Sequence, residues 1–331
     1  MSKEVTMRDI AARLNVSAVS VSKAISGKEG VSDSVRELIL KTAAEMGYKY
    51  TSKSSEEAVH YNVGVIVSQT FISDSAFYSK LFQNLAIEFG KAGHSCTLEI
   101  LSHRDEREGY LPVGVAGEHM DGVIVLGPIS DICMSKVLRI ETPCVFVDNY
   151  TPDDNADCVV SDNVYGSHML TNYLIKKGHR KIAFVGTVTA TNSIMDRYLG
   201  YLKSLMASGI EVRPDYILPD RDEKGYLKDI DIPADMPEAF VCNCDEVAYH
   251  LVEQLNKKNV KVPEDVSIVG FDDYIFATIS KPQLTTFRVD MEEMSRVAVE
   301  LMVDKLKNPH SYHGRKMISG QIVIRDSVRE K

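Results

Sequence analysis

Apolar residues recur at helical spacing in three short stretches of the first fifty residues. Their apolar positions are Ile10, Ala11 and Leu14, then Val21, Ala24 and Ile25, then Val35, Ile39, Ala43 and Met46. A hydroxyl residue stands before each stretch, at Thr6, Ser17 and Ser32, where it can cap a helix. Gly27 and Gly47 follow the second and third stretches and can end them. We therefore predict three helices with a tight turn between the first two, which fits a helix-turn-helix unit or a three-helix bundle that binds nothing.

The second predicted helix carries side chains that suit contact with DNA. Its solvent face and flanks hold no acidic residue and consist of Ser17, Ala18, Val19, Ser20, Ser22, Lys23 and Ser26. Small hydroxyl side chains let a backbone approach phosphate closely, and Lys23 can reach a guanine edge or a phosphate. This face favours the DNA-binding unit over the inert bundle.

From residue 62 onward, β-branched and apolar runs alternate with amphipathic segments. The runs that predict strands are 63–67, 97–101, 122–126, 144–148, 182–186, 239–242 and 266–271. Continuous apolar strands separated by helices indicate parallel sheets covered on both faces. The strands exceed one ordinary sheet, so we predict two doubly wound α/β lobes with a ligand cleft beyond the carboxyl ends of the strands. Ser68, Asp148, Asp245 and Asp272 each follow a strand and are candidates for that cleft.

Charge is unevenly distributed along this chain of 331 residues, whose net charge is −9. The first sixty residues hold nine basic and eight acidic side chains, whereas the rest hold 29 basic and 39 acidic ones. Because the acidic body repels phosphate, any contact with nucleic acid must be made by the first sixty residues.

The sequence lacks the motifs of several other protein classes. It has no run of apolar residues long enough to span a membrane and no apolar core of a secretory leader. The six cysteines form no C-x-x-C pair, which predicts reduced, mostly buried thiols and a cytoplasmic protein. No phosphate-binding glycine loop and no nucleophile elbow occurs, so we predict neither an enzyme nor a cofactor. His310 and His313 lack neighbouring ligands, so no metal site is expected.

The motifs of the first fifty residues resemble those of a known family. Residues 5–11, 16–17, 21–27, 30–32 and 47–48 are similar to the headpiece of the lactose-repressor (LacI/GalR) family of bacterial transcription regulators, and the resemblance continues through the body. It implies that Ala18, Val19 and Lys23 read bases. It also implies that phosphates are contacted by Thr6, Ser17, Ser22, Ser26 and Ser32.

The segment after the headpiece departs from the family pattern. The family usually has Pro-Asn after the aromatic residue, then Ala-Arg and a leucine that opens a base step in the minor groove. Here Tyr50 and Thr51 replace Pro-Asn, and Glu57 replaces the leucine. Since the minor groove repels a carboxylate, we expect weaker bending of DNA or a different spacing of half-sites.

Two further motifs in the body point to an effector site. Arg197 begins the family's R-x-x-G-aromatic pattern, and Asp272 lies in its G-F-D-D motif. The resemblance implies that these two side chains bind effector hydroxyls, with Phe77, Asp148 and Tyr274 as further pocket residues. From the residues alone, Arg197 can instead form a surface ion pair, Asp272 can cap a turn and Phe77 can be core.

One position changes the expected specificity. Members often have Asn-Asp where this chain has Cys244-Asp245, with Asn243 one place earlier. The usual hydroxyl-binding amide is therefore absent, which leaves the identity of the sugar open.

These features predict a small all-α headpiece at 1–49, an atypical hinge at 50–60 and a periplasmic-binding-protein-like core at 61–331. The first lobe is expected at about 61–160 plus 290–315, and the second at about 161–288 plus 316–331. The predicted function is a homodimeric repressor that binds an inverted-repeat operator and responds to a small polar effector, a sugar or sugar derivative. The alternative is a cytoplasmic ligand-sensing module that has lost operator binding and acts through protein contacts. The C-terminal residues show no leucine heptads that would predict a tetramer.

Overall fold

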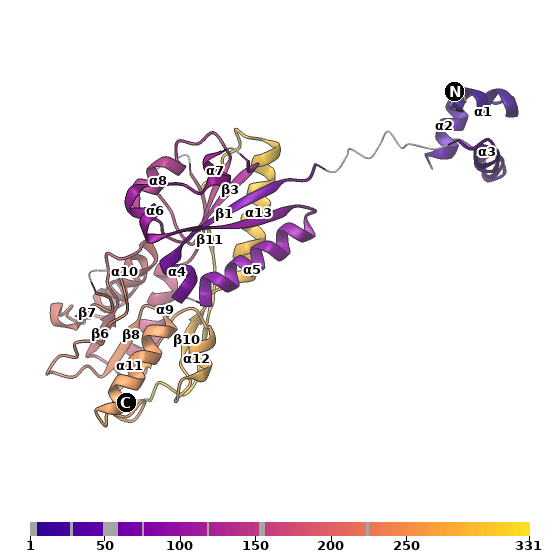
Figure 1. The fold of residues 1–331 in the computed structure, drawn as a ribbon. Coiled ribbons are helices and arrows are strands. Elements are labelled where there is room, and N and C mark those ends of the chain that lie inside the picture. Colours follow the sequence, from indigo (N-terminus) through magenta and orange to yellow (C-terminus); the bar gives the residue numbers. More distant parts are fainter. Residues whose placement is uncertain are drawn as a thin grey trace. The chain divides into compact units, whose positions relative to one another are not determined.

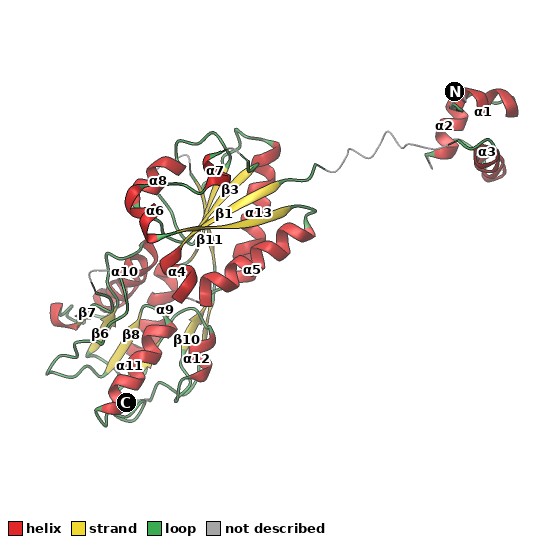
Figure 2. Cartoon of the chain, viewed as in Figure 1, coloured by secondary structure: helices red, strands yellow, loops and turns green. Residues whose placement is uncertain are grey.

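The chain folds into two compact units, Met1–Val59 and His60–Lys331. The computed structural model describes residues 5–26, 29–48, 59–74, 76–117, 119–151, 156–222 and 225–331. Figure 1 and Figure 2 show a helical first unit and a larger second unit in which helices cover strands. The predicted class, a helix-turn-helix headpiece and an α/β core of two parallel-sheet lobes, is confirmed.

The first unit consists of the predicted short helices around a small apolar core. These are α1 (Met7–Leu14), α2 (Ala18–Ile25) and α3 (Asp33–Glu45). Thr6 and Asp9 form a reciprocal capping box at α1, and the Ser17 side chain accepts a hydrogen bond from Ser20 N–H at α2. Ile10 and Ile39 are fully buried in the core of this unit. Ser32 occupies the N-cap position of α3, but its side chain makes no capping hydrogen bond, so that prediction is wrong in its detail. Gly27 lies outside the described residues.

The first lobe of the core is built on a parallel sheet in the order β11-β5-β4-β3-β1-β2. Its strands are β1 (Asn62–Ser68), β2 (Ser95–Leu101), β3 (Gly122–Leu126), β4 (Cys144–Val147), β5 (Asp157–Ser161) and β11 (Arg315–Ile318). One face packs on α5 (Ala76–Lys91) and α13 (Met291–Lys307), and the other on α6 (His103–Glu108), α7 (Val113–Ala116) and α8 (Asp131–Val137). Burial on both faces explains why the inner strands β1, β3 and β4 are almost continuously apolar, whereas the edge strands β2 and β11 are partly exposed and carry polar residues.

The second lobe is built on a parallel sheet in the order β7-β6-β8-β9. Its strands are β6 (Ile182–Val185), β7 (Ile217–Leu218), β8 (Ala239–Cys242) and β9 (Ser267–Val269). The helices α9 (Asn163–Lys176) and α10 (Asn192–Ala207) cover one face, and α11 (Asp245–Lys257) covers the other. The short helices α4 (Gln69–Asp74), α12 (Ile275–Ile279) and η1 (Pro214–Tyr216) lie in connections.

The boundary between the lobes near the C-terminus differs from the prediction. Strand β11 pairs with β5 as far as Ile318, so residues 316–318 belong to the first lobe and not to the second. The strand that follows, β12 (Gln321–Val323), joins neither parallel sheet and pairs antiparallel with β10 (Thr286–Arg288). Sequence periodicity could not show this, because two short apolar strands do not reveal their partners.

A buried ion pair fixes β11 and α13 to the first lobe. The Asp157 carboxylate is fully buried and accepts hydrogen bonds from Lys305 Nζ at 2.6 Å and from the backbone N–H groups of His313 and Gly314 at 2.7 and 2.8 Å. These contacts connect the first residue of β5 with the end of α13 and with the segment that leads into β11. The segment that leaves β11 for β12 therefore starts from a strand that is firmly attached to the first lobe.

Replacing Lys305 by methionine is expected to lower the free energy of unfolding of the core by about 3 kcal/mol. Removing one partner of a buried pair leaves the charge of the Asp157 carboxylate without a counter-ion in a site shielded from solvent. Urea unfolding followed by circular dichroism measures the loss. Lys307→Met, at an exposed position of the same helix, is the control and should change stability by no more than about 0.5 kcal/mol. Equal unfolding midpoints for the two variants would contradict this account.

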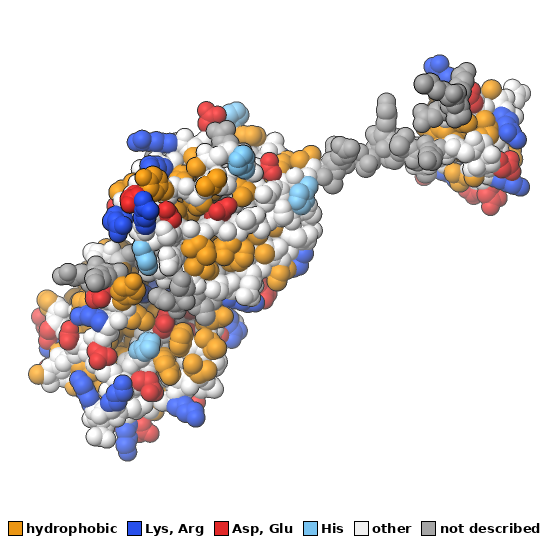
Figure 3. Space-filling model, viewed as in Figure 1, with side chains coloured by type: hydrophobic (Ala, Val, Ile, Leu, Met, Phe, Trp, Pro, Cys, Tyr) orange, Lys and Arg blue, Asp and Glu red, His pale blue; other side chains and the backbone are white. Residues whose placement is uncertain are grey.

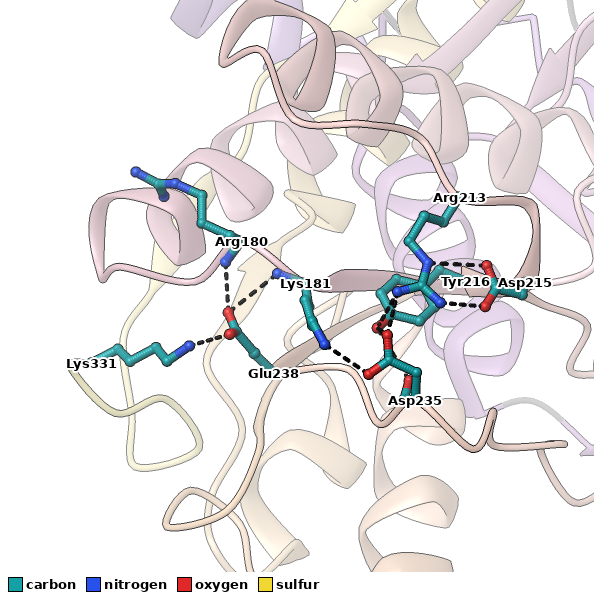
Figure 4. A network of polar contacts seen from close by, with 8 residues as sticks. All are labelled: Arg180, Lys181, Arg213, Asp215, Tyr216, Asp235, Glu238 and Lys331. Atoms are coloured by element: carbon teal, nitrogen blue, oxygen red, sulfur yellow. Dashed lines mark hydrogen bonds and ion pairs between the residues drawn. The ribbon is translucent and has the colours of Figure 1, made fainter.

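Charged side chains link the end of the chain to the outer surface of the second lobe (Figure 4). Glu238 accepts hydrogen bonds from Lys331 Nζ and from the backbone N–H of Lys181. Lys181 Nζ donates to Asp235 at 2.7 Å, and Asp235 also pairs with Arg213 at 2.5 Å. Because these side chains are partly exposed to solvent, the network adds little stability. It holds the last residue against the lobe.

Candidate functional site

The residues that were expected to contact DNA lie on the exposed side of α2 and at the N-termini of α1 and α3. All eight predicted DNA-contact residues are exposed, and Val19 is 65% exposed although it is apolar. The opposite side of α2 buries Val21 and Ala24 against the other two helices, which fixes which face points outward. A Cβ built at Gly30, where φ is +102°, would lie 3.0 Å from Lys23 Nζ. The Lys23 side chain therefore packs against the backbone at Gly30. Only glycine adopts this φ angle without strain, and its lack of a side chain leaves room for the lysine.

A cavity of about 380 Å³ lies between the two lobes of the core. It lies beyond the carboxyl ends of β4, β8 and β9, where the parallel-sheet rule places ligands. All five predicted effector residues line it, namely Phe77, Asp148, Arg197, Asp272 and Tyr274. Asp245 lines it as well. Ser68 does not line it and instead donates a hydrogen bond to Glu106 at 2.6 Å.

Arg197 is held rigidly on the floor of the cavity and is only 6% exposed. Its Nε donates to Asn163 Oδ1 at 2.8 Å, and its Nη1 donates to the carbonyl oxygen of Asn243 at 2.5 Å. Its Nη2 lies 3.2 Å from Asp272 Oδ1, and its guanidinium stacks 3.9 Å above the Phe271 ring. Arg197 is therefore a buried ion-pair partner and not part of a surface pair.

The glycine of the R-x-x-G motif has a packing role. A Cβ at Gly200 would collide with the carbonyl oxygen of Val164 on α9. The absence of a side chain lets α10 approach α9 closely, and α10 carries Arg197. The motif thus contains both Arg197, which faces the cavity, and Gly200, whose close helix contact positions α10.

Asp272 lies in a strained turn that is held by β10 and by Arg325, which follows β12. Asp272 and Asp273 have φ values of +108° and +55°, in the region that disfavours residues with side chains. Asp272 N–H donates to the Phe287 carbonyl at 2.8 Å. The Asp273 carboxylate pairs with Arg288 and Arg325, each at 2.6 Å. Tyr274 takes the N-cap position of α12 without a side-chain cap, so Asp272 does not serve as the cap of that helix.

Asp148 faces the cavity from the first lobe, with φ +54°. The Tyr78 hydroxyl donates to Asp148 Oδ2 at 2.8 Å, while Oδ1 is buried and makes no hydrogen bond to any described residue. A Cβ at Gly127 would lie 2.6 Å from the Tyr78 ring, so this glycine makes room for the tyrosine. Phe77, beside it, belongs to the hydrophobic core as well as to the cavity wall.

Burial raises the pKa of the carboxyl groups around the cavity. Burial raises the pKa of Asp272 to about 7, although Arg197 opposes the shift. Burial also raises the pKa of Asp148 and of Asp245, the second of which accepts hydrogen bonds from Thr286 Oγ1 at 2.6 Å and Tyr274 N–H at 3.1 Å. These raised pKa values mean that burial destabilises the ionised carboxylates. A ligand that donates hydrogen bonds to them would stabilise the ionised form.

The amide next to Cys244 does not face a ligand. Asn243 Nδ2 donates to the Val185 carbonyl at 3.0 Å and to Asp220 Oδ2 at 2.8 Å, so it ties β8 to β6. The Cys244 thiol lines the cavity, and burial raises its pKa, which keeps it protonated. All six cysteines lie within the described residues as free thiols.

Some lining residues were not predicted. Arg221, Tyr226 and Leu227 reach the cavity from the irregular segment that follows β7. Charged residues and prolines dominate residues 219–238 without periodicity, so no sequence signal placed this segment at the cleft. Tyr78 also lines the cavity and was not predicted.

Polar contacts beside the cavity join the two lobes. Tyr150, which follows β4, donates its hydroxyl to Asp196 Oδ1 on α10 at 3.0 Å. Arg315, at the start of β11, donates to Asp196 Oδ2 at 3.2 Å and lies 4.2 Å above the Tyr150 ring. Asp196 precedes Arg197, so the helix that carries the cavity arginine is also held by the first lobe.

A helix-turn-helix unit joined to a two-lobed α/β core with a polar cavity between its lobes defines a class of DNA-binding regulators. Residues 6–50 match the family model of bacterial regulatory proteins, lacI family, and residues 171–328 match that of the periplasmic binding protein-like domain. The chain belongs to the lacI family of bacterial regulatory proteins.

Its relatives extend over nearly the whole chain. It is 26% identical to the HTH-type transcriptional repressor CytR of Escherichia coli strain K12, over 98% of this chain and 96% of the relative. The transcriptional regulator CelR in complex with cellobiose has a TM-score of 0.70 at 24% identity, over 98% of this chain and all of that one. The lac repressor dimer bound to operator and the anti-inducer ONPF has a TM-score of 0.66 at 18% identity, over 99% and 100%.

The family consists of DNA-binding transcription regulators, and the relatives of similar length include repressors. In the part of the chain that the structure describes, no helix is both long and apolar enough to cross a bilayer.

Proposed function

We propose that the chain is a cytoplasmic transcription repressor whose operator affinity is set by a small polar effector, a sugar or sugar derivative. Residues 1–49 are the DNA-binding headpiece, 50–60 the hinge and 61–331 the effector-binding and dimerisation core. The observation that carries the proposal is the buried Arg197–Asp272 pair in the cavity between the lobes. An arginine and a carboxylate facing one cavity can hold neighbouring hydroxyls by paired hydrogen bonds.

A ligand in this cavity would act on the arrangement of the lobes. It would contact Asp148 of the first lobe and Asp272 of the second at once, and so favour one relative position of the two. The same carboxylate turn is held by Arg288 and Arg325 in the passages between the lobes. The effector affinity of the two lobe arrangements then differs, and operator affinity changes reciprocally. The cellobiose in the CelR structure supports a carbohydrate effector.

Exposed apolar side chains support a homodimer. Ile87 on α5 and Ile275 and Ile279 on α12 are about half exposed. Hydrophobic side chains gather over α5 and over α12 on the face shown in Figure 3. A two-fold dimer through this face would present two headpieces to an inverted repeat, because the symmetry of protein and DNA must match. The lac repressor dimer on its operator supports the same assembly.

The test is selection of bound DNA from a random pool at two salt concentrations. We expect an enriched inverted repeat that survives the higher salt, since base contacts persist when phosphate contacts weaken. Sequence-blind binding that disappears with salt would reject the repressor.

A second candidate function is a ligand-sensing module that no longer binds an operator. The hinge sequence favours it, because Tyr50, Thr51 and Glu57 replace the residues with which the family opens the minor groove. These three positions lie outside the described residues. Ligand binding together with sequence-blind DNA binding would support this candidate.

Lys23→Ala is expected to weaken operator binding about tenfold, because one side-chain contact to a guanine or phosphate contributes about 1–3 kcal/mol. A mobility-shift titration on the selected operator measures the change. Lys41→Ala, on an exposed position of α3, is the control and should leave the affinity close to that of the parent. If both variants bind equally, α2 does not read the operator through Lys23.

A further inference from the structure

We infer that the cavity selects an uncharged, hydroxyl-rich effector and rejects compounds that carry a phosphate or carboxylate group. This inference rests on the proposed function and adds the charge class of the effector to it. It follows from the acceptor atoms, the cations and the helix ends that face the cavity.

The cavity offers acceptors that the protein leaves without donors. Asp148 is 6% exposed, and its Oδ1 makes no hydrogen bond to any described residue. Asp272 Oδ1 lies 3.2 Å from Arg197 Nη2 as an ion pair, but it accepts no hydrogen bond from any described residue. A buried carboxylate oxygen without a donor is costly, so the site is stabilised by a ligand that supplies O–H groups. A phosphate or carboxylate brings acceptors to the same places and is repelled.

The positive charges of the cavity are already engaged. Among the described residues that line it, four are acidic and two are arginines. Every guanidinium nitrogen of Arg197 faces a protein oxygen, on Asn163, Asn243 or Asp272. Arg221 donates from Nη1 to the Gly225 carbonyl, and its Nε makes no hydrogen bond to any described residue but lies 3.7 Å from the buried Asp220 carboxylate as an ion pair. Each arginine is thus paired with a carboxylate, so neither contributes an uncompensated positive charge to the cavity.

Two helix ends that could attract an anion are also occupied. The N-terminus of α11 lines the cavity, but its first turn contains Asp245 and Glu246, whose carboxylates offset the partial positive charge there. The N-terminus of α10 is capped by Thr191, whose side chain accepts a hydrogen bond from Ile194 N–H. The features that favour anions in other proteins are thus balanced within this chain.

The test is native mass spectrometry of the full-length protein after incubation with a pooled bacterial metabolite extract, with and without prior treatment by alkaline phosphatase. We expect a bound small molecule whose released mass and fragments contain neither phosphate nor carboxylate. Its occupancy should stay the same or rise after phosphatase treatment. A bound compound that fragments to phosphate and is lost after treatment would overturn this inference and leave the proposed function standing, as would a bound carboxylate. No bound compound from either extract would reject the proposed effector site itself, and this inference with it.

A matched pair of variants tests the assigned residue. Asp148→Asn keeps the shape of the side chain but replaces one acceptor by a donor. With the same two extracts, it should hold the uncharged compound at least tenfold more weakly and should gain phosphate-bearing compounds from the untreated extract. Asp231→Asn, on an exposed position outside the cavity, is the control and should behave as the parent. If thermal unfolding shows that Asp148→Asn does not fold, Asp272→Asn takes its place. Unchanged capture by a folded variant would overturn the role of the carboxylates.

Discussion

Arg197→Met is expected to abolish the effect of the effector on operator binding and to lower the free energy of unfolding by about 3 kcal/mol. The substitution removes the cavity cation and leaves Asp272 buried without its ion-pair partner. Breaking one side of a buried pair costs more than the pair contributes, because the remaining charge is desolvated. Calorimetric titration with the captured compound and urea unfolding measure the two effects. Effector affinity equal to that of the parent would contradict the assigned role.

The stability defect of Arg197→Met should depend on pH. Burial already raises the pKa of Asp272 to about 7, above its value in the unfolded chain, and loss of the arginine raises it further. The folded state therefore binds the proton more tightly than the unfolded state, so stability falls as pH rises toward the folded-state pKa. We expect a larger defect at pH 8 than at pH 6. Adding Asp272→Asn to the variant should recover stability and remove this dependence.

Ile39→Ala is expected to reduce operator affinity by at least about thirtyfold without changing effector binding. Ile39 is fully buried in the small core of the headpiece, and removing such a side chain costs about 2–5 kcal/mol. A unit of this size buries little apolar surface and has little stability to lose. Because the headpiece and the core are separate compact units, unfolding of the first leaves the second intact.

The matched control for this prediction is Leu38→Ala, the neighbouring position, which is 52% exposed. It should change operator affinity by less than threefold. Anisotropy titration measures binding, and differential scanning calorimetry separates the transition of the headpiece from that of the core. Joint loss of both transitions in Ile39→Ala would contradict independent folding of the two units.

The two predictions act at opposite ends of the same proposed mechanism. Arg197 lies on α10, whose preceding residue Asp196 is held by Tyr150 and Arg315 of the first lobe. A movement of Arg197 in the cavity would therefore also move the adjacent Asp196 and alter its contacts with the first lobe. The headpiece contributes the DNA-binding surface, and its core is independent of the cavity.

Local patterns in the sequence determined much of the fold. The helix periodicity and caps of the first fifty residues predicted α1 to α3, because a helix depends on neighbours three and four residues apart. The apolar runs predicted the parallel strands, since burial on both faces leaves no alternation. Arg197 was found through a motif, and Asp272 was found through a motif and through its position after a strand. The bare residues left open whether they were buried.

Only the tertiary structure decided the contacts that depend on residues far apart in the chain. Residues 316–318 join the first sheet because β5, more than 150 residues earlier, offers a free edge to β11. Tyr78 became a cavity residue through Asp148, 70 positions away, and the Asn243 amide was engaged by Asp220. The charge class of the effector likewise follows from which guanidinium and carboxylate atoms already have partners. The partners of these strands and side chains are determined by how the elements pack together, and they cannot be inferred from spacing along the sequence.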